Sequence, residues 1–123
     1  MPIVGLRLSN VHTAADYPKI PSYWTDPLSR VFNLWGYVDV RDVAQACRLA
    51  LSADIAGARS YIVAADDTLM DRTSGELVAQ VFPEVPVRSP LAGHESLLSI
   101  ARARAELGYV PRYSWREILG AAE

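Results

Sequence analysis

The chain has 123 residues, of which 50% are hydrophobic and 21% are charged, and its formal net charge is −2. This length and composition predict one globular domain, residues 1–123, with a core of ordinary size. The slight acidity and the dispersed arginines argue against the basic surface with which proteins bind nucleic acid. No apolar stretch is long enough to cross a membrane and no signal-peptide pattern occurs, so we expect a cytoplasmic protein.

Cysteine and histidine usage argues against a metal centre. Cys47 is the single cysteine, and the two histidines, His12 and His94, lie far apart in the sequence. A metal site therefore lacks ligands at a suitable spacing, and no internal disulfide can form. Cys47 falls within an apolar helical pattern, which predicts a buried and unreactive thiol.

Strands and helices alternate along the chain, which is typical of an α/β unit with parallel pairing. Residues 3–8 are mostly β-branched and large apolar residues, as in a parallel strand buried on both faces. Asp42 is expected to cap the first long helix, and a serine or threonine precedes each later one. In chain order we expect a strand at 3–8, a loop at 10–22, one or two helical turns within 23–32, a strand at 35–40, a helix at 43–53, a strand at 60–64, a helix at 75–82, an extended piece at 85–87, a helix ending at 107 and a helix at 115–121.

Three segments together resemble a known family. Residues 6–11 read Leu-Arg-Leu-Ser-Asn-Val, residues 36–47 read Gly-Tyr-Val-Asp-Val-Arg-Asp-Val-Ala-Gln-Ala-Cys, and residues 107–111 read Leu-Gly-Tyr-Val-Pro. Their order and spacing resemble the C-terminal half of an extended short-chain dehydrogenase/reductase, the NAD(P)-dependent epimerase/dehydratase family. The resemblance implies an α/β fold that is an incomplete, Rossmann-like C-terminal portion, with short parallel strands, a small substrate-binding lobe and packing helices.

The resemblance also implies roles for the residues after the first strand. Ser9, Asn10 and Val11 match the segment that passes the nicotinamide, and Asn10 and His12 match positions beside the substrate. The family often has tyrosine where this chain has His12. An amide such as that of Asn10 offers a donor and an acceptor without charge. The alternative is that Asn10 only tolerates the turn after a strand.

Two sets of family residues are missing. The sequence contains neither a Gly-rich phosphate-binding turn nor Tyr-x-x-x-Lys, and its one lysine, Lys19, follows Ala15 at that spacing. We therefore expect no catalytic residue in this chain and no NAD or NADP bound to it alone. The cofactor would belong to a preceding nucleotide-binding half, which we expect as a partner.

Arginines decide the expected substrate class. Nucleotide-sugar members often hold the diphosphate with arginines, where this chain has Asn33 and the pair His94-Glu95. A smaller or uncharged substrate is therefore expected. Arg72 and Arg88 are the candidates for substrate binding from other directions.

Three functional hypotheses remain open. The first is a C-terminal half of an epimerase/dehydratase-like oxidoreductase, which supplies pocket walls and is inactive alone. The second is a non-catalytic binding or interaction module that reuses this half-fold. The third, an unrelated small α/β enzyme, would need a nucleophile–base pair, and no His/Asp arrangement is identifiable around Ser9, Ser60 or Ser89. Because strands of the sheet would be missing, we also expect self-association. Asp39 and Asp42 are expected to be structural.

Overall fold

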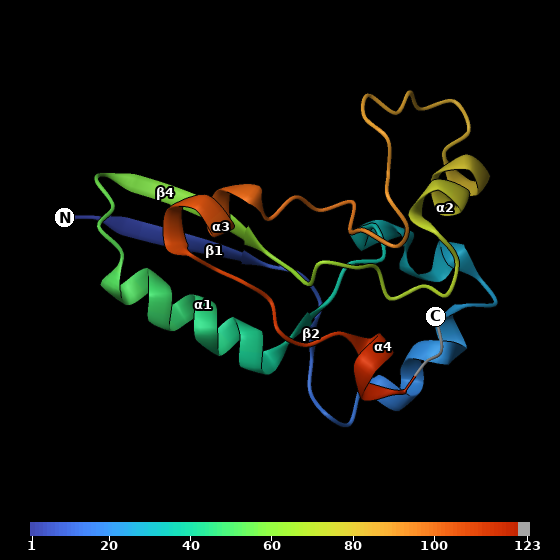
Figure 1. Cartoon of the computed structure of the whole chain (residues 1–123), viewed down its shortest axis with the longest axis horizontal. Helices are drawn as coiled ribbons and strands as arrows, with labels where there is room; N and C mark the ends of the chain where they lie inside the picture. The colour runs from blue at the N-terminus through green and yellow to red at the C-terminus, as the bar shows by residue number, and fades with distance from the viewer. Residues whose placement is uncertain (121–123) are drawn as a thin grey trace.

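The computed structural model describes residues 1–120 and is an α/β fold with short parallel strands (Figure 1). The chain forms strand β1, strand β2, the 3₁₀ helices η1 and η2, strand β3, helix α1, strand β4 and helices α2, α3 and α4. Their bounds in the same order are Ile3–Leu8, Val11–His12, Tyr17–Tyr23, Pro27–Asn33, Val38–Asp39, Val40–Ser52, Ala58–Val63, Ser74–Val81, Ala101–Leu107 and Trp115–Ile118.

The longer sheet pairs β1 with β4 in parallel, from Ile3 opposite Ala58 to Leu8 opposite Val63. One face of this sheet packs against α1 and α3 (Figure 1). The buried residues of this core are Val38, Ala46, Tyr61, Val63, Ala64, Ile100, Ala103, Leu107 and Tyr109. The other face is open, since Ile3, Gly5 and Arg7 are exposed. Burial of residues 3–8 on both faces was therefore a wrong prediction, because the described residues place helices on one face only.

A second core lies beyond the carboxyl ends of these strands, among η1, η2, α2 and α4. Its buried residues are Tyr17, Ile20, Trp35, Tyr37, Ala65, Leu69, Met70, Leu77 and Trp115. The indole N–H groups of Trp24, Trp35 and Trp115 each donate to a backbone carbonyl, so the polar end of each ring is satisfied. The three tryptophans are packing residues, as the sequence predicted.

The start of α1 corrects the predicted cap. Asp39, rather than Asp42, is the N-cap, and its carboxylate accepts the backbone N–H of Arg41. Asp42 lies buried in the first turn, where its carboxyl accepts the backbone N–H groups of Arg112 and Tyr113. Both aspartates suit a helix start by residue type, and their tertiary partners decide which of them caps it.

Other differences have local causes. The strand expected at 35–40 is confined to Val38–Asp39, because Leu34 and Trp35 have positive φ angles of 54° and 59° that turn the chain. Residues 17–23 form η1 instead of a loop, and residues 85–87 form no strand. Cys47 is exposed rather than buried. The expected helix end at Ala121 lies outside the described residues.

The buried carboxyl of Asp42 holds the segment before α4 against α1, at 3.0 Å from the nitrogen of Arg112 and 3.2 Å from that of Tyr113. Replacement by alanine leaves both N–H groups without their acceptor. We expect Asp42→Ala to lower the free energy of unfolding by about 3 kcal/mol, measured by urea denaturation. The control Asp54→Ala, at an exposed position, should change it by less than about 0.5 kcal/mol. Equal effects of the two substitutions would contradict this role.

Candidate functional site

Parallel pairing brings the carboxyl ends of β1 and β4 to one edge of the sheet. The backbone N–H of Ser9 donates to the carbonyl of Val63 at 3.0 Å, so the segments that follow the two strands begin side by side. The N–H of Val38 donates to the carbonyl of Asn10 at 2.9 Å and adds a third segment. Open α/β sheets bind ligands beyond this edge.

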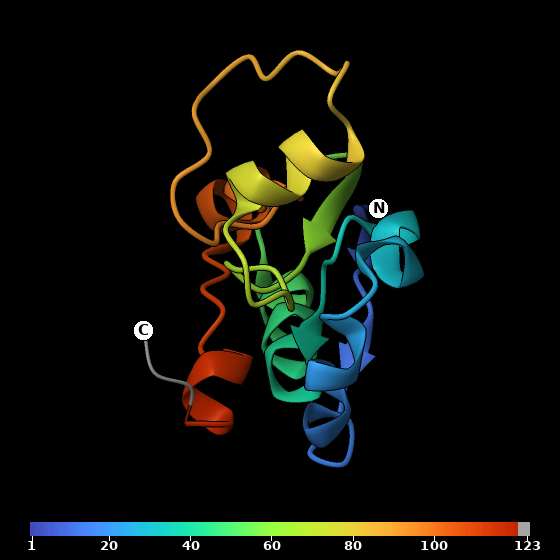
Figure 2. The same ribbon diagram turned by 90° about the vertical axis from the view of Figure 1, so that its right-hand side faces the viewer.

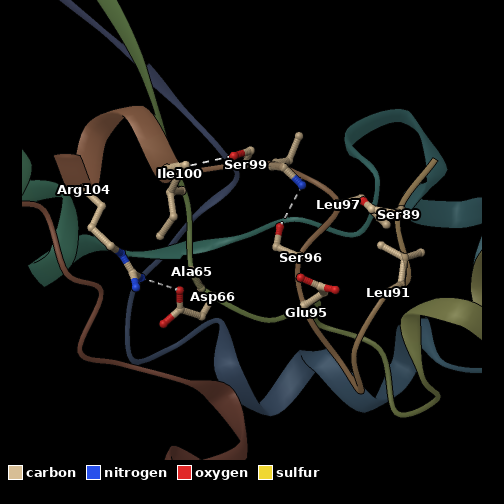
Figure 3. A pocket seen from close by; sticks show the side chains of 12 residues that line it. Ala65, Asp66, Ser89, Leu91, Glu95, Ser96, Leu97, Ser99, Ile100 and Arg104 are labelled. Atoms are coloured by element: carbon tan, nitrogen blue, oxygen red, sulfur yellow. Dashed lines mark hydrogen bonds and ion pairs between the residues drawn. The ribbon is translucent and has the colours of Figure 1, made fainter. Parts of the chain in front are cut away.

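A cavity of about 510 Å3 opens beyond the end of β4 (Figure 3). Its floor is formed by the residues after β4, and its walls come from the segment that leads into α3. The lining residues are Ala65, Asp66, Ser89, Leu91, Glu95, Ser96, Leu97, Leu98, Ser99, Ile100, Ala101 and Arg104. The segment between α2 and α3, which supplies most of the wall, arches away from the rest of the chain (Figure 2).

The polar side chains of this cavity are serines, two carboxylates and one arginine. The Ser96 hydroxyl oxygen accepts the N–H of Leu98 at 3.0 Å, and that of Ser99 accepts the N–H of Ala101 at 3.3 Å (Figure 3). Each hydroxyl keeps a hydrogen that it can donate to a ligand. The lining cation, Arg104, pairs with Asp66 at 2.9 Å, so its charge is already compensated.

Gly36 connects the cavity wall to the end of β1. A β-carbon at Gly36 would lie 2.6 Å from Cδ1 of Leu98 and 2.7 Å from Oγ of Ser9. Only glycine therefore allows these three residues to pack together. Ser9 lies behind the wall that Leu98 forms, and its buried Oγ has no hydrogen-bond partner among residues 1–120.

Asn10 and His12 form a second group beyond β1. His12 is 2% exposed, and its Nε2 lies 3.1 Å from the amide nitrogen of Asn10. Its ring packs against Tyr17 and Tyr37, with centroid distances of 5.6 Å and 5.7 Å. Burial lowers the pKa of His12 below 6.5. His12 is thus a core residue that stays neutral near pH 7.

The tyrosines around His12 are poor proton donors and acceptors. The hydroxyl of Tyr17 donates to Asp39 at 2.7 Å, and that of Tyr37 donates to Asp67 at 2.6 Å. Burial and these carboxylates raise the pKa of both tyrosines above 10. A tyrosine that acts as acid and base near neutral pH needs a lowered pKa, so neither ring suits that role.

Asp39 is held in its ionised form. Burial by itself would raise the pKa of the Asp39 carboxyl, but hydrogen bonds from Arg41 and Tyr17 lower it below 3.8. The hydrogen bond from Tyr17 measures 2.7 Å, and Nε of Arg41 lies 2.9 Å from the carboxylate. These contacts support the structural role that was expected for Asp39.

The predicted arginines lie apart from this group. Arg72 donates to the carbonyl of Trp24 at 2.6 Å and to Gln80 at 3.0 Å, which ties α2 to the segment after η1. Arg88 lies beside a separate apolar cavity between α2 and the arched segment. The described lining of the cavity in Figure 3 includes none of the predicted substrate residues Asn10, His12, Arg72 and Arg88.

Sequence reasoning missed the residues that line the cavity. Asp66 follows β4, whereas Ser96, Ser99 and Arg104 come from a segment thirty or more positions later. The local signal for these residues in the sequence is that Ser96 and Ser99 flank two leucines just before α3. Val11, a predicted cofactor residue, is 37% exposed and pairs with Val38 of β3.

Within residues 1–120 no group of three or more His, Cys, Asp or Glu side chains is arranged to hold a metal ion. Helices of the length and apolarity needed to span a membrane are also absent from this part of the chain.

Comparison with known proteins gave one similarity in structure. No family model matches the sequence, and no curated protein matches it. The chain is similar to the crystal structure of the Bordetella bronchiseptica enzyme WbmG in complex with NAD and UDP, with a TM-score of 0.48 and 18% identity. The similarity covers 98% of this chain and 45% of that one, so the chain spans less than half of the WbmG structure. A likeness at this level assigns no site or function to this chain.

The packing around Gly36 can be tested by substitution. We expect Gly36→Ala to destabilise the fold by about 1–3 kcal/mol, because the new methyl group must displace Leu98 and Ser9. Gly75→Ala is the matched control, since its β-carbon meets no atom within 4 Å. That variant should be neutral or slightly stabilising in chemical denaturation. An unchanged free energy of unfolding in Gly36→Ala would contradict the tight packing of Leu98 and Ser9 against Gly36.

The burial of the His12 imidazole predicts how the stability of the fold depends on pH. The unfolded chain binds a proton at His12 near pH 6.5, whereas burial lowers the pKa of the folded chain below that value. The unfolded state therefore binds more protons, and the stability that neutral His12 contributes is lost as the pH falls below 6.5, by at most about 1.4 kcal/mol per pH unit.

Urea denaturation between pH 7.5 and 5 checks this sign. The stability advantage of wild type over His12→Gln should shrink as the pH falls. His94→Gln removes the other histidine and should keep the wild-type dependence. An advantage of wild type that grows on acidification would contradict the buried neutral imidazole.

Proposed function

We propose that this chain is the substrate-binding part of an NAD(P)-dependent epimerase/dehydratase-like oxidoreductase, in which nucleotide binding is supplied from outside these 123 residues. The observation that carries this proposal is the cavity beyond the carboxyl end of β4, whose wall residue Leu98 packs with Ser9, at the end of β1, around Gly36. Ligands of open α/β sheets bind at this edge. The resemblance of the segments around Ser9, Gly36 and Gly108 supports the same assignment.

The lining of the cavity favours an uncharged, hydroxyl-bearing substrate. Two serine hydroxyls, Ser96 and Ser99, offer hydrogens, and the charge of Arg104 is compensated by Asp66. Glu95 adds a carboxylate to the lining. A phosphate group would meet no free cation among the described lining residues, whereas hydroxyl groups of a small carbohydrate would find both donors and acceptors.

The proposal gives this chain a positioning role. Ser9, Asn10 and Val11, which follow β1, would border the nicotinamide. Asn10 and the buried His12 would hold this segment in place from the core side. The nicotinamide, when bound, supplies hydride transfer. This chain would line the site, orient the substrate and exclude water.

The acid and base would come from the nucleotide-binding part. The raised pKa values of Tyr17 and Tyr37 make them unsuited to proton transfer near neutral pH. The single lysine, Lys19, does not stand four residues after a tyrosine. The alternative, a non-catalytic binding module, would use the same cavity without any nucleotide-binding partner.

Calorimetric titration of the purified chain with NAD(H) and NADP(H) tests whether this chain binds the cofactor by itself. We expect no heat of binding up to about 1 mM cofactor, because the Gly-rich turn is missing from the sequence. Binding at micromolar concentration, roughly −8 kcal/mol, would overturn the proposal.

The DNA upstream of Met1 separates the two candidate functions. An in-frame Gly-rich turn followed by Tyr-x-x-x-Lys would support the oxidoreductase part. A translation start signal with no such coding sequence before it would favour the stand-alone module.

A further inference from the structure

A second cavity adjoins the one in Figure 3 and lies between α2 and the arched segment. We propose that the substrate is a neutral, hydroxyl-bearing molecule that carries an alkyl or aryl group, and that the second cavity holds this apolar group. The inference deepens the proposed function and rests on it for the position of the hydroxyl-bearing part, which the first cavity would hold.

The second cavity has an apolar lining. Its volume is about 410 Å3, which is within the size range of small-molecule sites. The residues that line it are Leu34, Val78, Phe82, Val85, Val87, Arg88, Ser89, Leu91 and Leu97. A hydrated polar group would find only Ser89 and the exposed Arg88 as partners in this lining. An alkyl or aryl group would instead remove apolar surface from water on both sides of the contact.

One wall of the second cavity is fixed by the fold itself. The ring of Phe82 packs edge-on against the buried Trp35, with a centroid distance of 6.1 Å. The backbone N–H of Phe82 donates to the carbonyl of Val78 at 2.8 Å, and that of Leu34 donates to the carbonyl of Val31 at 3.0 Å. These apolar side chains therefore form a preorganised surface, so that a ligand does not have to order them on binding.

The opposite wall is the arched segment at residues 83–92 (Figure 2). Val85 and Val87 on this arch are 55% and 52% exposed, although both line the cavity. The arch is attached at its far end, where the N–H of Ser74 donates to the carbonyl of Gly93 at 2.9 Å. An apolar group between the arch and α2 would cover the two valines, and this burial favours binding.

The two cavities meet at Ser89, Leu91 and Leu97, which line both of them. Ser89 and Leu91 lie on the side of the first cavity opposite Arg104 (Figure 3). The first cavity thus has its ion pair at one end and the start of the apolar cavity at the other. A ligand whose hydroxyl groups lie in the first cavity can extend an apolar group past the two leucines into the second.

Calorimetric titration of the 123-residue chain with n-alkyl β-glucosides, from methyl to hexyl, tests this inference. The dissociation constant should fall about two- to fourfold for each added methylene, because each one buries further apolar surface. Amide resonances localise the two parts of the ligand. Every member should shift those of residues 96–104, whereas only the longer members should shift those of Leu34 and Val87.

A pair of matched substitutions locates the alkyl chain. Val87→Asp puts a carboxylate into the second cavity at a half-exposed position, and it should abolish the dependence on chain length while methyl glucoside still binds. Val110→Asp makes the same change at a 45% exposed valine that lines neither cavity, and it should keep the wild-type dependence.

The outcomes separate the inference from the proposed function. Equal affinities for methyl and hexyl glucoside would overturn the inference and leave the proposed function standing. Binding of no member of the series, or a chain-length dependence that survives Val87→Asp, would also overturn the inference. Cofactor binding by the isolated chain would contradict the proposed function without changing the results of the alkyl series.

Discussion

The buried carboxyl groups of Asp39 and Asp42 hold the two cores of this chain together. Asp39 accepts hydrogen bonds from Tyr17 in η1 and from Arg41 at the start of α1. Asp42 accepts the backbone N–H groups of Arg112 and Tyr113, just before α4. A buried carboxyl is tolerated only when such partners replace water. Both halves of the molecule must therefore be folded before either group is satisfied.

The same constraint positions the candidate site. Strand β3 ends at Asp39 and continues directly into α1, so the backbone before it is placed against the end of β1. Gly36 can then pack between Ser9 and Leu98 because it has no side chain. The cavity beyond β4 opens on the other side of Leu98. The buried carboxyl of Asp39 thus stabilises the fold and also fixes the position of the cavity wall, although Asp39 does not line the cavity.

Local features were predictable where all the residues that produce them lie within one short segment. Thr73 and Ser114 cap α2 and α4 with their hydroxyl oxygens, and Gly108 ends α3 with a φ of 74°. The apolar run at residues 3–8 forms β1 with its predicted bounds. The site residues named from the sequence stay predictions. Asn10 contacts His12 and Arg72 binds the backbone of another segment, and none of the three lines the cavity.

By itself the sequence determined the alternation of strands and helices, most helix ends, and the absence of a Gly-rich turn and of Tyr-x-x-x-Lys. These properties depend on residue type and on spacing within a few positions. The tertiary structure alone decided that Asp39 caps α1, that Cys47 lines an open groove, and that Asp66, Ser96 and Arg104 surround one cavity. Each of these depends on side chains that meet across long stretches of chain, where burial and hydrogen-bond partners cannot be read from neighbouring residues.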